Sequence, residues 1–189
     1  MKRIDLIICG FGGQGVIFAG ELIGRAGMLA GMESAQSSAY GAEARGSACS
    51  TGVVLSDEPI DYPIVRQPDI LLAFSQDGYR AYASLVKSGG QIFYDCDLVR
   101  PASIDSIEQT GIPATAEAAA IGNKNVANVV MLAKMLAATE ILPQEALIKS
   151  IIEQSSPAYR EINLKALVLC QLCNVVCHPK RSEGSRLDE

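Results

Sequence analysis

The sequence predicts a three-layer α/β/α domain whose mainly parallel sheet carries an antiparallel hairpin addition. Three observations favour this fold class. Short apolar runs alternate with segments of helical periodicity, the first run ends in a glycine-rich turn, and one hairpin-like turn interrupts the alternation. At 189 residues the chain fits one such domain. We expect it to span residues 1–177, with the polar, aperiodic segment 178–189 as a flexible tail.

The first predicted unit is a strand, a turn and a helix. Residues 4–9 form a short apolar run, which is typical of a buried parallel strand. A helix is predicted over about 14–31, because one apolar stripe recurs there at helical spacing, formed by Ala19, Leu22, Ile23, Ala26 and Ala30. Gly31 is positioned to end this helix in the left-handed conformation.

The rest of the chain supplies further strands and helices. Short apolar or small-residue runs predict strands at 34–38, 48–55, 60–62, 70–74 and 91–95. Ser56-Asp57-Glu58-Pro59 is a turn signal, so 48–55 and 60–62 are predicted to form the hairpin. Residues 101–112 are interpreted as a variable connection. Helices are predicted at about 77–86, 116–120, 125–138, 143–150 and 163–176, of which 125–138 is apolar nearly all round.

Composition excludes several classes of protein. A formal charge of −5, a 5% aromatic content and no Lys/Arg cluster longer than Lys180-Arg181 weigh against nucleic-acid binding. No apolar run approaches the roughly 18–20 residues needed to cross a membrane. Asp5 interrupts the apolar start, so we expect no export signal. The six cysteines are therefore expected to be thiols in a cytoplasmic protein.

A glycine-rich turn is the first candidate site. Gly10-Phe11-Gly12-Gly13-Gln14-Gly15 matches G-x-G-x-x-G between a strand and a helix, where backbone N–H groups can meet an anion. Alternatively, the glycines only permit close helix–strand packing. A dinucleotide fingerprint also needs an acid closing the second strand, which here ends at Ala39-Tyr40. The candidate cofactor-binding residues are Gly10, Gly12, Gly13, Gln14, Gly15, Tyr40, Glu43 and Arg45.

Other polar clusters have two interpretations each. Arg45 suits a carboxylate or phosphate, or an internal pair with Glu43. Asp95 and Asp97 suit magnesium, although two acids after a strand more often form a turn. Helix capping is favoured for the remaining polar candidates, Ser75, Asp77, Asn123 and Asn128. A zinc site at Cys170, Cys173, Cys177 and His178 is disfavoured against cysteines that pack as small apolar residues. We predict no metal site and no catalytic residue.

Several motifs in order resemble one known family. They are Gly10–Gly15, Tyr40-Gly41-Ala42-Glu43-Ala44-Arg45-Gly46, Ser56–Pro63, Pro68-Asp69-Ile70-Leu71 and Gly122-Asn123 with Asn128. Together, over about residues 3–172, they resemble the gamma subunits of 2-oxoacid:ferredoxin oxidoreductases, which correspond to domain III of pyruvate-ferredoxin oxidoreductase. The second motif and Ile60-Asp61-Tyr62-Pro63 are most similar to the 2-oxoglutarate branch. Ala42 and Ser47 depart from the family pattern.

The resemblance implies a subunit without a complete active site. The whole enzyme decarboxylates a 2-oxoacid on thiamine diphosphate, passes electrons through iron–sulfur clusters to ferredoxin, and forms an acyl-coenzyme A. It implies that thiamine diphosphate, magnesium and clusters belong to an alpha and a beta subunit, with a delta subunit left open. The implied role of this chain is to line the thiamine and coenzyme A cleft. The alternatives are a stand-alone NAD(P)-binding Rossmann-type oxidoreductase and a non-catalytic assembly module.

Overall fold

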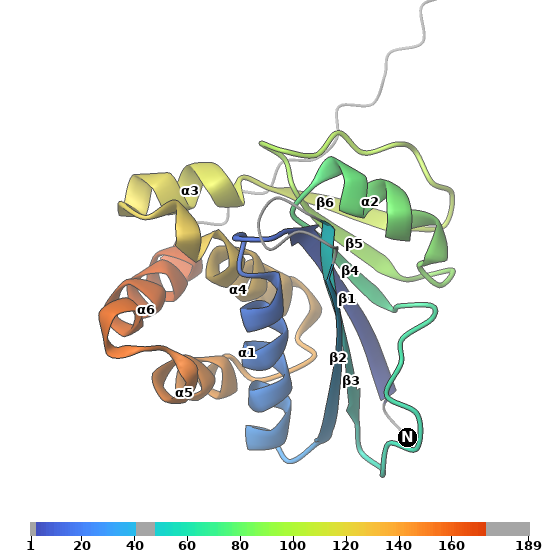
Figure 1. The fold of residues 1–189 in the computed structure, drawn as a ribbon, viewed down its shortest axis with the longest axis horizontal. Helices are drawn as coiled ribbons and strands as arrows, with labels where there is room; N and C mark the ends of the chain where they lie inside the picture. The colour runs from blue at the N-terminus through green and yellow to red at the C-terminus, as the bar shows by residue number, and fades with distance from the viewer. Residues whose placement is uncertain (1–2, 41–47, 173–189) are drawn as a thin grey trace, which may run out of the picture.

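The computed structural model describes residues 3–40 and 48–172, except the side chains of residues 40 and 170–172; the remaining residues lie outside the description. A six-stranded sheet separates α2 from the other helices (Figure 1). The strands are β1 (Arg3–Phe11), β2 (Glu33–Tyr40), β3 (Ala48–Ser56), β4 (Ile70–Ala73), β5 (Gln91–Asp95) and β6 (Glu108–Ile112). The helices are α1 (Val16–Leu29), α2 (Gln76–Tyr82), α3 (Ala114–Ile121), α4 (Ala127–Thr139), α5 (Gln144–Gln154) and α6 (Pro157–Leu172), with short 3-10 turns η1 (Ala83–Leu85) and η2 (Lys124–Val126).

The strand order confirms the predicted fold class. The order is β2-β3-β1-β4-β5-β6. β1, β4, β5 and β6 are parallel to one another, and β3 runs antiparallel to both of its neighbours, β1 and β2. β3 is therefore the antiparallel addition to a mainly parallel sheet, and it lies inside the sheet between β1 and β2.

The predicted hairpin partner of β3 was wrong. Residues 60–62 form no strand, and β3 pairs instead with β2 and β1. Proline has no backbone N–H to donate to a ladder, and Pro59, Pro63 and Pro68 punctuate this segment. The chain between β3 and β4 therefore stays outside the sheet.

The sequence patterns also missed one strand and shifted several helix ends. β6 occupies part of the stretch that was interpreted as a variable connection. Its sequence, Glu-Gln-Thr-Gly-Ile, is mostly polar because an edge strand is half exposed, so it lacks the apolar signal. The last described helix begins at Pro157, about two turns before the predicted start. By contrast, Gly31 ends α1 as predicted: its φ is 85°, and the Met32 N–H donates to the Gly27 carbonyl at 3.0 Å.

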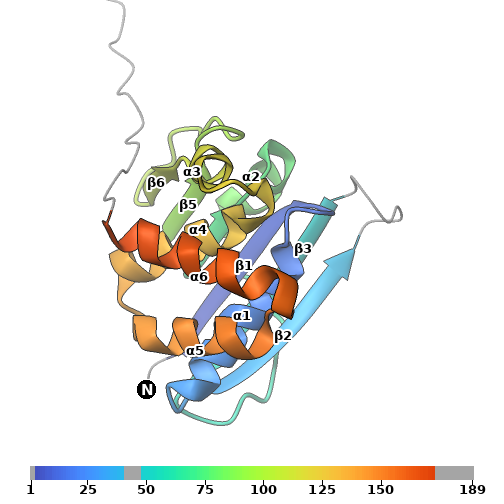
Figure 2. The ribbon, with the colours of Figure 1, turned by 90° about the vertical axis from the view of Figure 1, so that its left-hand side faces the viewer.

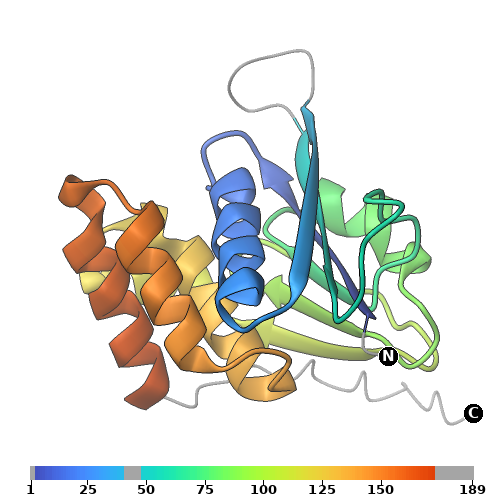
Figure 3. The same ribbon diagram turned by 90° about the horizontal axis from the view of Figure 1, so that it is seen from below.

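Alternating residues of β1 supply two hydrophobic cores, one on each face of the sheet. Leu6 and Ile8 face the core shared with α1 and α4, whereas Ile7 and Cys9 face α2. On the larger side, α5 packs on α1 and α6 packs on α4, as Figure 3 shows. Residues 127–136 of α4 are all buried, which confirms the prediction from their apolar composition. Figure 2 shows α6 lying over α4.

The two acids after β5 form the predicted turn. Asp95 is fully buried, and its carboxylate accepts hydrogen bonds from the Asp97 N–H at 3.1 Å, the Thr115 N–H at 3.1 Å and the Thr115 hydroxyl at 2.6 Å. The Asp97 carboxylate accepts from the Ala116 N–H at 2.8 Å. Both acids therefore satisfy free backbone donors at the start of α3. Burial raises the pKa of Asp95 above its ordinary value of 3.8, despite these hydrogen bonds.

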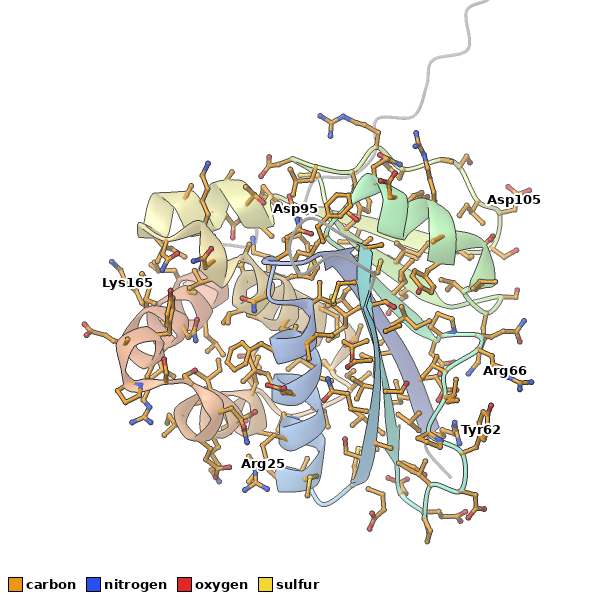
Figure 4. All side chains as sticks on the ribbon, in the orientation of Figure 1. Arg25, Tyr62, Arg66, Asp95, Asp105 and Lys165 are labelled. Carbon is orange, nitrogen blue, oxygen red and sulfur yellow. The ribbon has the colours of Figure 1, made fainter. Side chains whose placement is uncertain are left out.

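This raised pKa predicts a pH dependence of stability. The folded chain holds the Asp95 proton more tightly than the unfolded chain does. The free energy of unfolding should therefore fall as the pH increases from about 3.8 through the folded pKa. Urea unfolding at a series of pH values, compared between wild type and Asp95→Asn, isolates this contribution. Asp105→Asn, at an exposed position (Figure 4), is the control. The free energy of unfolding of wild type minus that of Asp95→Asn should fall as the pH rises. If it rises with pH instead, the assignment is wrong.

Candidate functional site

The candidate site lies at the edge of the sheet where the parallel strands end. β1 leads into the glycine-rich turn and then α1, while β4 ends beside it and leads into Ser75 (Figure 1). Asp95 follows at the end of β5, because β5 is parallel to β4. Ser75 caps α2 as predicted: its hydroxyl accepts from the Gly78 N–H at 3.1 Å.

Gln14 fastens the glycine-rich turn to the neighbouring strand. Its side-chain Oε1 accepts from the Phe11 N–H at 2.6 Å, and its Nε2 donates to the Phe74 carbonyl at 2.9 Å. One amide thus joins the ends of β1 and β4. Gly10 lies beneath it: a Cβ there would be 2.5 Å from the Gln14 Oε1 and 3.0 Å from the Phe74 Cβ. Gly10 and Gln14 therefore have structural roles inside the turn.

Gly15 allows α1 and α4 to meet. It caps α1 with a φ of 71°, and a Cβ there would lie 2.3 Å from the Asn128 Nδ2. That Nδ2 donates to the Gly15 carbonyl at 3.2 Å, and the Asn128 Oδ1 accepts from the Val129 N–H at 2.9 Å. The predicted capping by Asn128 was wrong: the N-cap of α4 is Val126, which makes no side-chain capping hydrogen bond, and Asn128 lies inside α4 and bridges it to α1. Asn123 caps η2 as predicted, because its Oδ1 accepts from the Asn125 N–H at 3.0 Å.

The outer part of the turn faces solvent. Gly13 is exposed with a φ of 103°, and no atom of the described residues lies within 4 Å of a Cβ built there. Gly15, the N-cap of α1, has no side chain to form a capping hydrogen bond, and the first turn of the helix carries no acidic residue. The first N–H groups of a helix form a partial positive charge. Gly12, Gly13 and the start of α1 therefore offer an accessible backbone surface that suits a negatively charged group.

The loop at residues 41–47 is followed by backbone that lies beside the turn. In the sheet, Phe11 is paired with Ala48, and Gly10 is paired with Cys49, which also pairs with Tyr40. The backbone that follows residues 41–47 is thus next to the turn, and the backbone of residue 40 lies one strand further away. Glu43, Arg45 and the side chain of Tyr40 lie outside the described residues.

A cleft lies behind the turn, and the sequence analysis did not predict it. It has a volume of about 410 Å³ and lies between the starts of α1, α4 and α6, with Gly13, Phe18, Asn128, Ser155, Tyr159 and Asn163 in its lining. Among the residues that the structure describes, no charged side chain lines it. Its amides are distributed over helices far apart in sequence, so no local motif could have identified it.

Two of the described cysteines, Cys9 and Cys49, are buried in the sheet. Burial raises the pKa of the Cys9 thiol to about 12 and also raises that of Cys49, so neither thiol ionises at neutral pH. The zinc interpretation of Cys170, Cys173, Cys177 and His178 concerns side chains outside the described residues. Among the side chains described, no group of three or more His, Cys, Asp or Glu residues is placed to hold a metal ion.

The strand order disfavours a dinucleotide site. In a Rossmann fold the acid that binds the ribose ends the strand beside the glycine-rich strand. Here β3 separates β2 from β1, and the acid of β2 is Glu33 at its opposite end. The glycine turn therefore has no ribose-binding carboxylate at the end of the second strand.

Comparison with known proteins gives consistent matches. A family model described as pyruvate ferredoxin/flavodoxin oxidoreductase matches residues 5–169. The 2-oxoglutarate synthase subunit KorC of Methanocaldococcus jannaschii is 41% identical, over 87% of this chain and 90% of the relative. KorC of Methanothermobacter marburgensis is 40% identical, over 87% and 92%.

One solved structure is also similar. The gamma subunit of a keto/oxoacid ferredoxin oxidoreductase from Geobacter sulfurreducens matches with a TM-score of 0.80 and 32% identity, over 90% of this chain and 95% of that chain.

Within residues 3–40 and 48–172, no helix combines the length and apolarity needed to span a membrane.

The two hydrogen bonds of the Gln14 side chain, which we call the Gln14 clamp, predict how substitutions of Gln14 lower the free energy of unfolding. Gln14→Met removes both hydrogen bonds and should lower the free energy of unfolding by about 2–4 kcal/mol, because a backbone donor and acceptor lose their partners. Gln14→Glu keeps an acceptor for Phe11 but places an oxygen against the Phe74 carbonyl. That variant should be unstable at neutral pH and partly recover in acid, where the new carboxyl is protonated and can donate. Denaturant unfolding at two pH values measures both effects, and wild-type stability in Gln14→Met would refute the clamp.

Proposed function

The chain belongs to the pyruvate ferredoxin/flavodoxin oxidoreductase family, and from that premise we propose that it is the gamma-type subunit of a 2-oxoglutarate:ferredoxin oxidoreductase. The observation that supports this most strongly is the end-to-end match with KorC. It covers 87% of this chain and 90% of the relative, which leaves little of either unmatched. The complex would work in the cytoplasm, decarboxylate 2-oxoglutarate oxidatively and form an acyl-coenzyme A.

In this proposal the reactive groups come from other subunits. Alpha and beta subunits, and a delta subunit where there is one, hold thiamine diphosphate, magnesium and the iron–sulfur clusters, and ferredoxin receives electrons through the complex. An iron–sulfur cluster needs about four grouped thiolates. The described thiols Cys9, Cys49 and Cys96 lie on separate elements, and two of them are buried in the sheet. The isolated chain is therefore expected to be inactive.

The part of this chain that would line the shared cleft is the glycine-rich turn with the neighbouring loop. Gly12, Gly13 and the uncapped start of α1 present backbone donors to a carboxylate or phosphate. Gly10, Gln14 and Gly15 hold that surface in shape. Tyr40, Glu43 and Arg45 would complete the wall, with Arg45 as the bidentate partner of an anion.

The subunit assignment predicts which proteins accompany this chain. A tagged chain purified from its native host should recover thiamine-binding and cluster-binding polypeptides in fixed ratio. The recovered complex should reduce ferredoxin with 2-oxoglutarate and coenzyme A, and faster than with pyruvate. The separately expressed chain should not do so. Recovery of a companion-free chain that oxidises a substrate by itself would refute the proposal.

The role of Arg45 predicts a kinetic effect. In the reconstituted complex, Arg45→Ala should raise the KM for coenzyme A or for 2-oxoglutarate about ten- to a hundredfold, because a charge-assisted hydrogen bond contributes about 1.5–3 kcal/mol. Arg25→Ala is the matched control, since Arg25 pairs with Glu153 at 2.6 Å on the helical side of the molecule (Figure 4). If Arg45→Ala kinetics equal those of wild type, Arg45 has only an internal or assembly role.

A further inference from the structure

β2 forms an open edge of the sheet. It is the first strand in the order β2-β3-β1-β4-β5-β6, so β3 is its only strand neighbour among the described residues. In an antiparallel pair, every second residue directs its N–H and C=O groups away from the neighbouring strand. β2 therefore carries a row of outward backbone donors and acceptors along its eight residues. Figure 2 shows β2 at the margin of the molecule, with no other described helix or strand beyond it.

β2 lacks the features that usually prevent pairing at a sheet edge. Such features are charged side chains, proline, bulges and short length. Residues 34–39 contain no charged residue and no proline, and pairing with β3 runs without a bulge from Glu33 to Tyr40. The opposite edge, β6, has five residues and begins with Glu108. Of the two edges, β2 is the one that suits a further strand.

The side chains of β2 leave its backbone accessible. Residues 33–39 are glutamate, serine, alanine and glutamine, so they include no β-branched or aromatic side chain, and none of them is fully buried. Hydrogen bonds join the side chains of Gln36 and Ser38 to the Thr51 hydroxyl at 3.0 Å and 3.2 Å, which stabilises β2 from the β3 side. On the outer side, the small side chains allow another backbone to approach.

We propose that β2 pairs antiparallel with β2 of a second copy of this chain, which joins the two sheets into one continuous sheet. The strand is compatible with its own copy in charge. Glu33 is its only charged residue, and antiparallel pairing keeps the two Glu33 side chains at opposite ends of the contact. Because both copies use the same edge, the contact closes as a dimer and cannot extend into a filament. This inference does not depend on the proposed function.

Symmetry defines the register of the pair. Residues directly opposite each other in a sheet point to the same face, so a two-fold axis normal to the sheet places one residue opposite its own copy. With Ser37 at the axis, residues 34–40 are paired and Glu33 stays outside the contact. Ala35 then lies opposite Ala39 of the second copy. Ala35 is half-buried and Ala39 is exposed, so both positions can accept a longer side chain.

The full chain in solution tests the pairing. In analytical ultracentrifugation it should form a dimer at about 100 µM and dissociate on dilution, because small interfaces bind weakly. Ala35→Lys/Ala39→Lys places like charges opposite each other at two positions, whereas Ala35→Lys/Ala39→Glu places opposite charges there. The dissociation constant of the first variant should be about tenfold higher than that of the second, or more. Equal dissociation constants would overturn the proposed pairing.

Controls separate the pairing from changes in folding. Glu108→Lys, on the opposite edge of the sheet, should leave the dimer unchanged, and unfolding midpoints show whether each variant is folded. Hydrogen exchange should slow at the amides of β2 at the concentrations where the dimer forms. A wild-type chain that stays monomeric at about 100 µM refutes the proposal. Protection of β2 only within a complex with other subunits would refute it as well, because a segment of another subunit then covers this edge.

Discussion

The amide of Gln14 is the contact on which the candidate site depends most. Parallel strands are joined along their length by the ladder, but their ends diverge once the chain turns towards its helices. The Gln14 side chain closes that gap by accepting from Phe11 and donating to Phe74. The Gln14 amide uses both its oxygen and its nitrogen to hold the inner part of the turn. The outer part, at Gly13, remains exposed to solvent. An exposed backbone surface with a defined shape results.

The position of β3 explains why a Rossmann-like turn serves a different purpose here. An antiparallel strand inserted between β1 and β2 moves the end of β2 away from β1 by one strand. The ribose contact of a dinucleotide site is lost by that insertion. In exchange, the connection between β2 and β3 ends beside the glycine turn, where Ala48 is paired with Phe11 and Cys49 with Gly10. The same local motif therefore combines with a charged loop in place of a ribose-binding acid.

Much of the fold could be predicted from the sequence because its signals are local. The buried strands, the end of α1 at Gly31 and the caps at Ser75 and Asn123 all depend on neighbours within a few residues. The missed features depend on distant partners. β6 is half exposed at the edge of the sheet, so its sequence is mostly polar and carries no apolar strand signal. Asn128 contacts Gly15, which lies 113 positions away in the sequence. The structural role of Gln14 likewise needs Phe74, 60 positions away.

The way the loop at residues 41–47 is attached has a consequence for divergence within the family. It joins two adjacent antiparallel strands whose register is fixed on both sides, at Tyr40 with Cys49 and at Ala48 with Phe11. Connecting segments of this kind tolerate changes of length and composition better than the strands that they connect. Relatives that act on different substrates can therefore differ in this loop while they keep the same sheet. Replacing residues 41–47 by the loop of such a relative would measure how much the loop contributes to substrate selectivity.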